Sequence, residues 1–320
     1  MYCQLTRIFF SVDAHGSTLV WRKWIKAQEI HKADILILSG DLTGKVLVPI
    51  IRQEDGSWTA KYFGRRWVFK SEAEIGDFES RLEGSGAYFI RVSKEEYEDL
   101  KNNPKKVENL IIDKMCERLR NWLQILLNHI DTKKVQVIVM PGNDDELAID
   151  DVIKSFEDRG VIYPLDKVME IEGHEVASSP YVNPTPWNTP REMDEKNLEK
   201  HLRSVIGKLK NPANSIFLFH CPPYNTHLDL APKLSKDLRP TVIAGMVQYE
   251  HVGSKSVRKM IEEFKPILGL HGHIHESGGV DRIGKTIVIN PGSEYSEGIL
   301  RAYIVEVDKK GVSNYWRVEG

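Results

Sequence analysis

Short apolar runs recur along the chain, and each stops at a group of polar residues. The first two, residues 8–12 and 33–39, are joined by a stretch from Ser17 to His31 in which apolar side chains recur three or four positions apart. We expect a buried strand for each run and, between them, a helix capped by Ser17. Two strands joined by a helix predict a parallel βαβ unit, whose carboxyl edge carries ligands.

The same alternation resumes after residue 130. Residues 135–140, 215–219 and 266–270 form further strand-like runs, whereas four prolines between 180 and 190 predict a loop. The other expected elements are helices at 147–159, 191–209 and 254–264, short strands within 161–176, and antiparallel strands at 286–289, 300–307 and 312–318. This order of elements favours the α/β class.

Residues 45–92 interrupt the alternation. Two strand-like segments, 46–51 and 58–63, flank Asp55-Gly56, which is a hairpin turn signal. We expect a small β-rich insertion, followed by a helix over 94–130 whose main segment begins at Pro104. Its aromatic residues are expected to form a small core, with stacking on a nucleobase as the alternative; they are Trp58, Tyr62, Phe63, Trp67 and Phe69. Its basic residues are expected on a solvated face, with phosphate binding as the alternative; they are Lys61, Arg65, Arg66 and Lys70.

The composition is that of a globular protein without a broad basic surface. The 320 residues are 41% apolar and 28% charged, and 44 basic against 46 acidic residues leave a net charge of −2. These values exclude a disordered chain. Because release of counterions drives binding to long nucleic acids, near-neutral charge makes them unlikely partners.

Cysteine usage and hydropathy favour the cytoplasm. Cys3, Cys116 and Cys221 lie far apart in sequence with no pairing pattern, so reduced thiols are expected. No apolar run approaches the roughly 20 residues that cross a bilayer, and the amino terminus does not resemble a signal peptide. We expect a cytoplasmic protein without a membrane partner; its oligomeric state stays open.

Residues able to bind a metal ion follow five of the apolar runs. They are Asp13 and His15, then Asp41, Asn143, His220, and finally His273 and His275. Carboxylate, amide and imidazole ligands suit Mn²⁺, Fe, Zn²⁺ or similar ions, whereas the lack of clustered cysteines argues against a structural zinc site. Seven ligands are too many for one ion. Two ions sharing a bridging carboxylate would use them all, in a geometry suited to attack at phosphorus.

Five ordered blocks resemble the motifs of the calcineurin-like metallophosphoesterase family, and they cover nearly the whole chain except the insertion. The blocks are Asp13-Ala14-His15, Gly40-Asp41, Gly142-Asn143-Asp144-Asp145, His220 and Gly272-His273-Ile274-His275. Residues 219–223, 253–254 and 290–293 resemble segments of small bacterial and archaeal members. The resemblance implies a four-layer α/β/β/α sandwich with two mixed sheets. Because the motifs run from 13 to 275 in one site, we expect residues 1–320 to form one domain, with 45–92 inserted at the active-site edge.

The resemblance also implies a role for each block. One ion would be held by Asp13, His15 and His275, the other by Asn143, His220 and His273, and Asp41 would bridge them. The water bridging both ions would be the nucleophile, because its pKa falls toward neutral on binding. Mn²⁺ is the first metal expected; Fe, Zn²⁺, Ni²⁺ and Co²⁺ are alternatives.

Asp144 departs from the family pattern. Much of the family has at this position a histidine that stabilises the substrate and protonates the leaving oxygen. An ionised carboxylate does neither well, and it repels phosphate unless it is coupled to a metal or protonated. With Asp144 in this catalytic position, we expect activity to favour good leaving groups such as aryl esters.

The remaining histidines and two other residues are assigned no ligand role. His271 and His251 are expected to be structural or to fix the tautomer of a ligand, and His227 is expected at the surface with the site as alternative. Cys221 is expected to point away from His220, since side chains alternate along a strand, and Arg191 is a weak candidate for a phosphate clamp. Surface positions are expected for His31, His129, His174 and His201.

The expected function is metal-dependent hydrolysis of a small phosphomonoester or phosphodiester. Two alternatives stay open. A catalytically weak metal-binding scaffold or interaction module on the same fold is favoured only by Asp144. A nuclease of the superfamily is disfavoured because the chain has no evident basic track.

Overall fold

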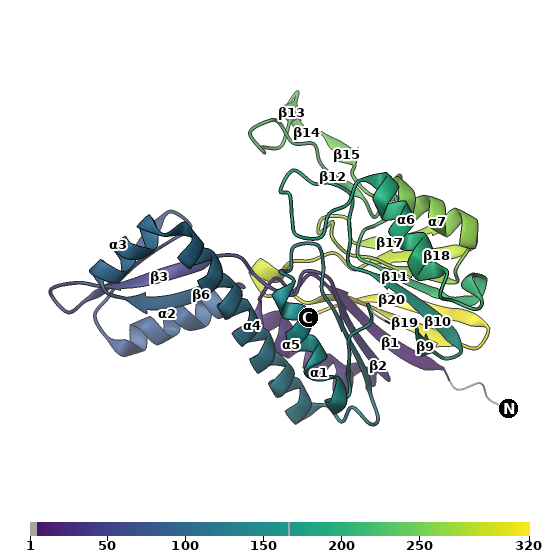
Figure 1. The fold of residues 1–320 in the computed structure, drawn as a ribbon, viewed down its shortest axis with the longest axis horizontal. Coiled ribbons are helices and arrows are strands. Elements are labelled where there is room, and N and C mark those ends of the chain that lie inside the picture. Colours follow the sequence, from purple (N-terminus) through teal and green to yellow (C-terminus); the bar gives the residue numbers. More distant parts are fainter. Residues whose placement is uncertain (1–4, 166) are drawn as a thin grey trace.

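Two mixed sheets form the centre of the computed structural model, which describes residues 5–165 and 167–320 (Figure 1). In the first sheet, β2 pairs in parallel with β1 on one side and with β7 on the other, and every residue of β2 is buried. Full burial fits a parallel strand covered on both faces. In spatial order the first sheet contains β20 (Gly311–Glu319), β19 (Arg301–Asp308), β1 (Thr6–Val12), β2 (Ile35–Ser39), β7 (Gln136–Met140) and β8 (Val161–Ile162).

The second sheet has a parallel centre and an antiparallel strand at each edge. Strand β11 pairs in parallel with β10 and β16, and β18 extends this parallel set. In spatial order the second sheet contains β17 (Gly279–Ile283), β18 (Thr286–Asn290), β16 (Leu268–Leu270), β11 (Ile216–Phe219), β10 (His174–Ser179) and β9 (Met169–Ile171).

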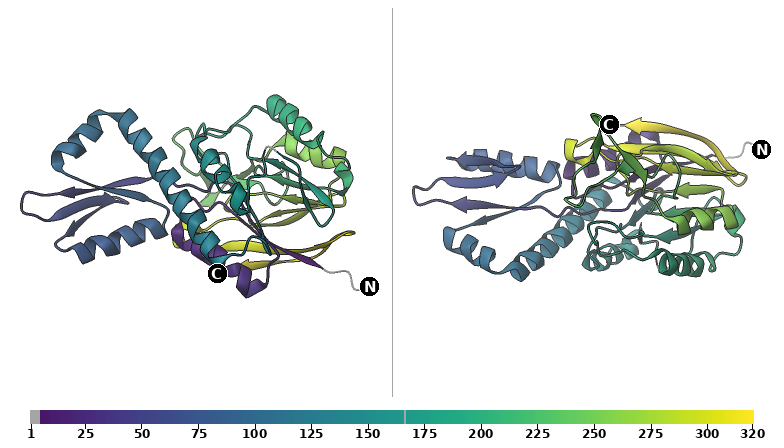
Figure 2. Two further views of the ribbon diagram at one scale, coloured as in Figure 1. Left: turned by 60° about the horizontal axis from the view of Figure 1, so that its bottom comes forward. Right: turned by 90° about the horizontal axis from the view of Figure 1, so that it is seen from above.

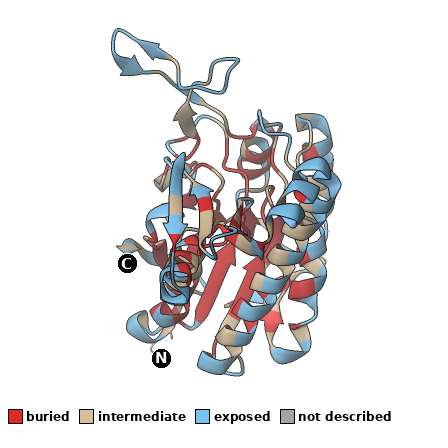
Figure 3. Cartoon of the chain, turned by 90° about the vertical axis from the view of Figure 1, so that its left-hand side faces the viewer, coloured by how far each residue is buried: buried red, intermediate tan, exposed pale blue. Residues whose placement is uncertain are grey.

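Three hydrophobic clusters join the sheets and helices into four layers. One cluster lies between the sheets and contains Phe10 and Ile37 of the first and Leu218 and Ile289 of the second. The outer face of the first sheet is covered by α1 (Thr18–His31), α4 (Pro104–His129) and α5 (Ala148–Lys154). The outer face of the second is covered by α6 (Glu195–Ile206) and α7 (Lys255–Phe264). The predicted α/β/β/α sandwich is confirmed, and Figure 3 shows its strands as the buried centre.

The insertion is a separate lobe beside the sandwich (Figures 1 and 2). Its sheet has the order β5 (Arg65–Phe69), β4 (Trp58–Tyr62), β3 (Leu47–Arg52) and β6 (Tyr88–Val92), with helices α2 (Glu72–Gly84) and α3 (Lys94–Asn102). The hairpin at Asp55-Gly56 and the helix beginning at Pro104 are confirmed. The description as β-rich is incomplete because it misses α2, whose start carries a capping box.

The aromatic core expected for the insertion is present with one exception. Phe69 and Phe78 are buried, and Trp58, Tyr62 and Trp67 pack against them. Phe63 is instead 85% exposed at the β4–β5 turn, where its φ of 47° is in the left-handed region.

The root of the insertion packs against the loop that follows β1. At Gly86, where φ is +90°, a Cβ atom would lie 2.1 Å from the carbonyl oxygen of His15. From α4, Arg118 donates hydrogen bonds to the carbonyls of Gly16 and Ala87, at 3.0 and 2.8 Å. Side chains larger than glycine are therefore excluded at this junction, and the insertion is anchored next to His15.

A narrow arm projects from the sandwich on the side away from α4 (Figure 1). It consists of β12 (Leu230–Pro232), β13 (Val242–Ile243), β14 (Met246–Val247) and β15 (Tyr249–His251). Its tip is exposed, including Ile243 and Met246 (Figure 3). The sequence pattern did not indicate this arm.

The structure also bears on the predicted length of one helix, on the cysteines and on membrane-spanning segments. The predicted helix at 147–159 is shorter: α5 ends at Lys154 and a 3₁₀ turn covers Glu157–Arg159. Two other 3₁₀ turns cover Pro212–Asn214 and Tyr295–Glu297. Cys116 and Cys221 are free thiols, as predicted, whereas Cys3 lies outside the described residues. Among the helices of the described ranges, none is long and apolar enough to cross a membrane.

Candidate metal centre

All seven predicted ligands follow the carboxyl ends of parallel strands. Three strands of the first sheet and two of the second end at the same edge of the sandwich, so their loops face one another. The ligands are Asp13 and His15 after β1, Asp41 after β2, Asn143 after β7, His220 after β11, and His273 and His275 after β16.

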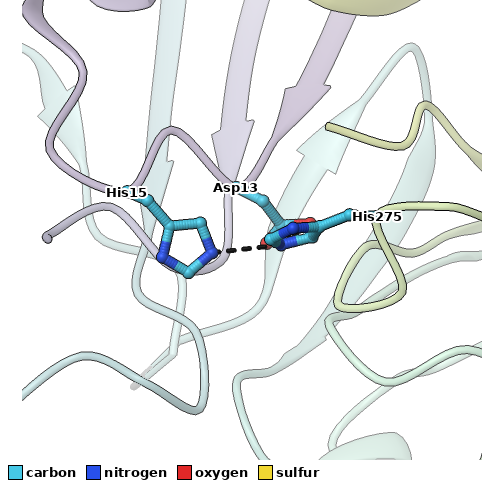
Figure 4. A group of neighbouring side chains, drawn as sticks. All are labelled: Asp13, His15 and His275. Atoms are coloured by element: carbon cyan, nitrogen blue, oxygen red, sulfur yellow. Dashed lines mark hydrogen bonds and ion pairs between the residues drawn. The ribbon is translucent and has the colours of Figure 1, made fainter. Parts of the chain in front are cut away.

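Asp13, His15 and His275 converge in one group (Figure 4). The Nε2 atoms of the two histidines are 3.1 Å apart, and Nε2 of His275 is 3.9 Å from Asp13 Oδ2. Their ligand atoms all lie within 4.8 Å of one another, which is close enough for one ion to contact all three.

Asp41, His220 and His273 form a second group of the same kind. Nε2 of His220 lies 3.6 Å from Asp41 Oδ2 and 3.0 Å from Asn143 Oδ1. Asp41 Oδ2 is also 3.7 Å from His15 Nε2, so this carboxylate lies between the two groups. The structure thus brings together all seven residues in the arrangement that the resemblance implied, while ligation itself stays a prediction.

The backbone at four of these residues adopts a conformation that side chains rarely tolerate. The φ angles are 54° at Asp13, 41° at His15, 33° at Asp41 and 69° at His273. Each such residue costs on the order of 1 to 3 kcal/mol and persists only where the surroundings hold it in place. Strain repeated at four residues of one cluster is typical of a functional site.

Gly40 leaves room for the His220 ring. Its φ is +87°, and a Cβ atom there would lie 2.0 Å from His220 Nδ1. A side chain at position 40 would therefore displace the imidazole from Asp41.

Asp145 joins two of the ligand loops. Its buried carboxylate accepts hydrogen bonds from the backbone N–H groups of Leu42, Thr43 and Gly142, each at 2.9 Å, and from the Thr43 hydroxyl. The segment after Asp41 is therefore fixed to the segment before Asn143. Sequence reasoning quoted Asp145 only as part of a motif and gave it no role.

The Asn143 amide is oriented by the proline-rich loop. Its Nδ2 donates to Thr189 Oγ1 at 2.8 Å, and the Thr189 hydroxyl donates to Glu192 Oε1 at 2.7 Å. With Nδ2 turned toward Thr189, Oδ1 faces His220. No sequence signal indicated Thr189 or Glu192, because both belong to a loop without periodicity.

Burial and mutual charge shift the titration of the cluster. Burial raises the pKa of Asp13, while His220 opposes the shift. Burial also acts to raise the pKa of Asp41, but His220, His15 and His273 together lower it well below the usual range. Because two adjacent buried carboxylates repel each other, they ionise together only when positive charge is supplied between them.

Two of the candidate ligand histidines are neutral at physiological pH. Burial lowers the pKa of His273 to about 4 and that of His275 to about 3. A neutral imidazole has a free lone pair for a cation. His220 differs, because Asp41 and Asp13 outweigh the effect of its burial and raise its pKa to about 9.

The residues fit divalent cations. Asp13 Oδ1 is buried and has no hydrogen-bond partner among the described residues. Buried polar atoms are normally paired, so a carboxylate oxygen left over in a cluster of imidazoles is well explained by a cation ligand. The mixed set of carboxylate, amide and imidazole groups suits Mn²⁺, Fe or Zn²⁺.

Asp144 is paired with a lysine that sequence reasoning did not consider. Its Oδ1 lies 2.5 Å from Lys45 Nζ, and its backbone N–H donates to Asp41 Oδ1 at 2.8 Å. Repulsion of phosphate by Asp144 was expected unless the carboxylate was protonated or coupled to a metal. The lysine supplies a third way to offset that charge.

The other histidines lie outside the two groups. His271 Nδ1 is within hydrogen-bonding distance of the backbone oxygens of Phe219 and Cys221, and burial lowers the pKa of His271 to about 4. His251 pairs with Asp229, and His227 is exposed beside Asp281. The surface position predicted for His174 is wrong, because its ring is buried between the carbonyls of Asn214 and Asp308.

Cys221 and Arg191 have structural surroundings. The Cys221 thiol is buried, bonds to Asn183 Oδ1 and not to a ligand, and has its pKa raised to about 12 by burial. Arg191 is buried and donates to Asp150 and to the carbonyls of Asp145 and Glu146. It therefore braces the loop after Asn143, and its weak candidacy as a phosphate clamp is not supported.

The comparisons with known proteins bear on the fold. No protein-family model matches the chain. An uncharacterized protein of Methanocaldococcus jannaschii is 40% identical over 163 residues, which cover 49% of this chain and 64% of that protein. The match thus spans less than two thirds of the relative's length.

Two solved structures share the architecture over the full length. One crystal structure aligns over 99% of both chains with 16% identity and a TM-score of 0.58. The crystal structure of the protein TT1561 of Thermus thermophilus aligns over 99% of both chains with 15% identity and a TM-score of 0.53. At these identities the likeness shows the fold alone.

Proposed function

We propose that this protein is a calcineurin-like metallophosphoesterase that hydrolyses a small phosphomonoester or phosphodiester. The observation that carries the proposal is the pair of adjacent three-residue groups, because Asp41 of one group also lies 3.7 Å from His15 of the other. Together with Asn143 they come from five loops of two sheets, and the motif order resembles that of the family. A scaffold has no need for two strained, buried clusters of this kind.

Each group has a role that its position supports. Asp13, His15 and His275 would hold one divalent cation; Asn143, His220 and His273 would hold the other, with Asp41 shared. Two such cations lower the pKa of a bound water toward neutral and offset negative charge on phosphoryl oxygens. The chain itself orients the ligands: Asp145 fixes the Asp41 loop, and Thr189 turns the Asn143 oxygen toward His220. Mn²⁺ is the first metal to test.

Turnover of an aryl phosphate tests the proposal. The purified protein would be treated with chelator, supplied again with Mn²⁺, and assayed on nitrophenyl phosphate monoester and diester. We expect turnover that depends on the cation and falls at least about 1,000-fold in Asp41→Asn, because the shared carboxylate loses its charge. Asp158→Asn, at an exposed position away from the site, is the matched control.

Three outcomes are informative. An Asp41→Asn protein as active as the wild type contradicts the assignment. A wild type that binds two cations and turns over neither ester supports the scaffold alternative. Cleavage of oligonucleotides faster than of either aryl ester would favour the nuclease.

A further inference from the structure

Lys45 forms an ion pair beside the candidate metal centre. Its Nζ is 2.5 Å from Asp144 Oδ1, and the two side chains are 40% and 22% exposed. The lysine is thus open to solvent while the carboxylate that holds it is mostly covered. Exposed pairs of this kind stabilise a fold by little, so the pair is not explained by stability.

The pair lies next to Asp41. The backbone N–H of Asp144 donates to Asp41 Oδ1, so the partner of Lys45 is bonded directly to the carboxylate between the two groups. Asp144 therefore connects Lys45 to Asp41.

The backbone of Lys45 is fixed from both sides. The N–H of Gly44 donates to the Tyr88 hydroxyl at 3.2 Å, and the carbonyl of Val46 accepts from the N–H of Tyr88 at 2.8 Å. Because Tyr88 begins β6, the insertion itself sets the position of Lys45. The lysine is held in place before any substrate arrives, which lowers the entropy lost on binding.

An ammonium group has more donors than Asp144 uses. It carries three N–H donors and no acceptor, so hydrogen bonds to Asp144 leave donors free for an anion. Two of the other basic side chains considered for this role are engaged elsewhere: Arg191 is buried and pairs with Asp150, and Arg65 stacks on Trp67 at 4.3 Å.

We propose that Lys45 binds a nonbridging phosphoryl oxygen of the substrate and that Asp144 is the positioning residue that holds its ammonium beside the candidate metal centre. This rests on the proposed function, because it assumes that a phosphoryl group occupies the metal centre. The root of the insertion would then contribute one positively charged side chain, Lys45, to the site.

The first test measures binding of inorganic phosphate to the Mn²⁺-loaded protein by calorimetry. We expect Lys45→Gln to raise the Kd for phosphate about 10- to 100-fold, because a charge-assisted hydrogen bond is lost. Lys45→Arg should recover most of the affinity, and the Mn²⁺ content should be unchanged in both. The matched control is Lys94→Gln, since the Lys94 side chain is similarly exposed and pairs with Glu54 at 2.7 Å elsewhere on the insertion.

A second variant separates binding from charge neutralisation. In Lys45→Gln alone, an unpaired Asp144 would also repel phosphate. In the Asp144→Asn background that repulsion is gone, so Lys45→Gln should still weaken phosphate binding at least about 5-fold if the ammonium contacts phosphate. No further loss in that background means that Lys45 only neutralises Asp144, and it overturns the proposal.

The remaining outcomes separate the two proposals. A wild type that turns over aryl phosphate and binds phosphate, with an unchanged Kd in Lys45→Gln, overturns the role of Lys45 alone. A Mn²⁺-loaded wild type that neither binds phosphate nor turns over an ester overturns the proposed function and this role with it.

Discussion

The candidate metal centre and the insertion are built in opposite ways. The candidate ligand loops come from five distant segments, are mostly buried, and contain four non-glycine residues with positive φ that are fixed by contacts between loops. The insertion folds around its own small cluster of aromatic and aliphatic side chains, and its surface carries exposed ion pairs such as Arg91 with Glu72 and Glu79. The geometry of the candidate metal centre therefore depends on the whole sandwich, whereas the fold of the insertion depends mostly on its own core.

The difference indicates that one region can hold the groups that would bind the cations while the other supplies contacts to the substrate. Buried, strained loops hold ligand atoms in fixed positions, which two-cation chemistry requires. A lobe with its own core can change shape without disturbing those loops. The two regions meet at Gly86 against His15, and at Lys45 against Asp144.

The largest effect is expected from the core of the insertion. Phe78 is 3% exposed and lies 5.0 to 5.1 Å from the rings of Phe69 and Trp67. Phe78→Ala should destabilise the lobe by about 3 to 5 kcal/mol, because it leaves a cavity. Hydrogen exchange should accelerate in β3 to β6 while the Mn²⁺ content stays unchanged.

Phe10→Ala is the matched comparison, since Phe10 is buried between the two sheets. It should cost a similar free energy but accelerate exchange across the sandwich and reduce the Mn²⁺ content. Loss of Mn²⁺ in Phe78→Ala would show that the lobe and the centre fold as one unit.

The second effect is expected at Gly40. Gly40→Ala places a methyl group against His220 and strains the backbone, so we expect a loss of about 2 to 4 kcal/mol of unfolding free energy and a loss of cation binding. Calorimetric Mn²⁺ titration and urea unfolding measure both. Gly56→Ala has a similar φ of +82° with no atom near the added methyl, so it isolates the backbone cost. Equal losses of unfolding free energy and of cation binding in the two variants would show that contact between the added methyl group and His220 is not the cause.

The third effect concerns the pH dependence of the metal-free protein. Its His220 has a pKa of about 9 against 6.5 when unfolded, so its ion pairs stabilise the fold fully below pH 6.5 and are lost as pH rises through about 9. The lowered pKa values of His273 and His275 act only below pH 6.5. Urea unfolding in chelator should show a loss of about 1 to 3 kcal/mol between pH 6.5 and 9.

His220→Gln tests the source of that slope. The variant should flatten it, whereas His129→Gln, at an exposed position on α4, should keep it. A slope that survives in His220→Gln must arise from another group.

The smallest effect is expected in the proline-rich loop. Thr189→Val removes the acceptor for Asn143 Nδ2, so affinity for one of the two cations should fall about 10-fold. Thr185→Val removes another hydroxyl that bonds Glu192 but does not contact Asn143, so it should leave the affinity unchanged. Equal behaviour of the two variants would mean that Thr189 does not orient the amide.

The same contrast explains what the sequence could predict. Asp13, Asp41 and His220 each follow a short buried strand, so motif and strand pattern together located them before their contacts were known. The same runs predicted the α/β class, and the family resemblance implied the four-layer sandwich. The helix α2 could have been found from Ser71 and Glu74, whose capping box is a local signal.

Other features could not be predicted because they depend on contacts between distant segments. Lys45 meets Asp144 only once the insertion root lies against the Asn143 loop. His174 was assigned to the surface from its turn-like surroundings, yet its ring is buried between backbone carbonyls of residues 214 and 308. Such partners leave no periodicity in the sequence.

Anomalous diffraction from a crystal grown with Mn²⁺ tests the central claim most directly. The account predicts two peaks on either side of the Asp41 carboxylate: one among Asp13, His15 and His275, the other among His220, His273 and Asn143. One peak in total, with the other group empty, would contradict the dinuclear centre. No peak at this edge of the sandwich would contradict the metal site itself.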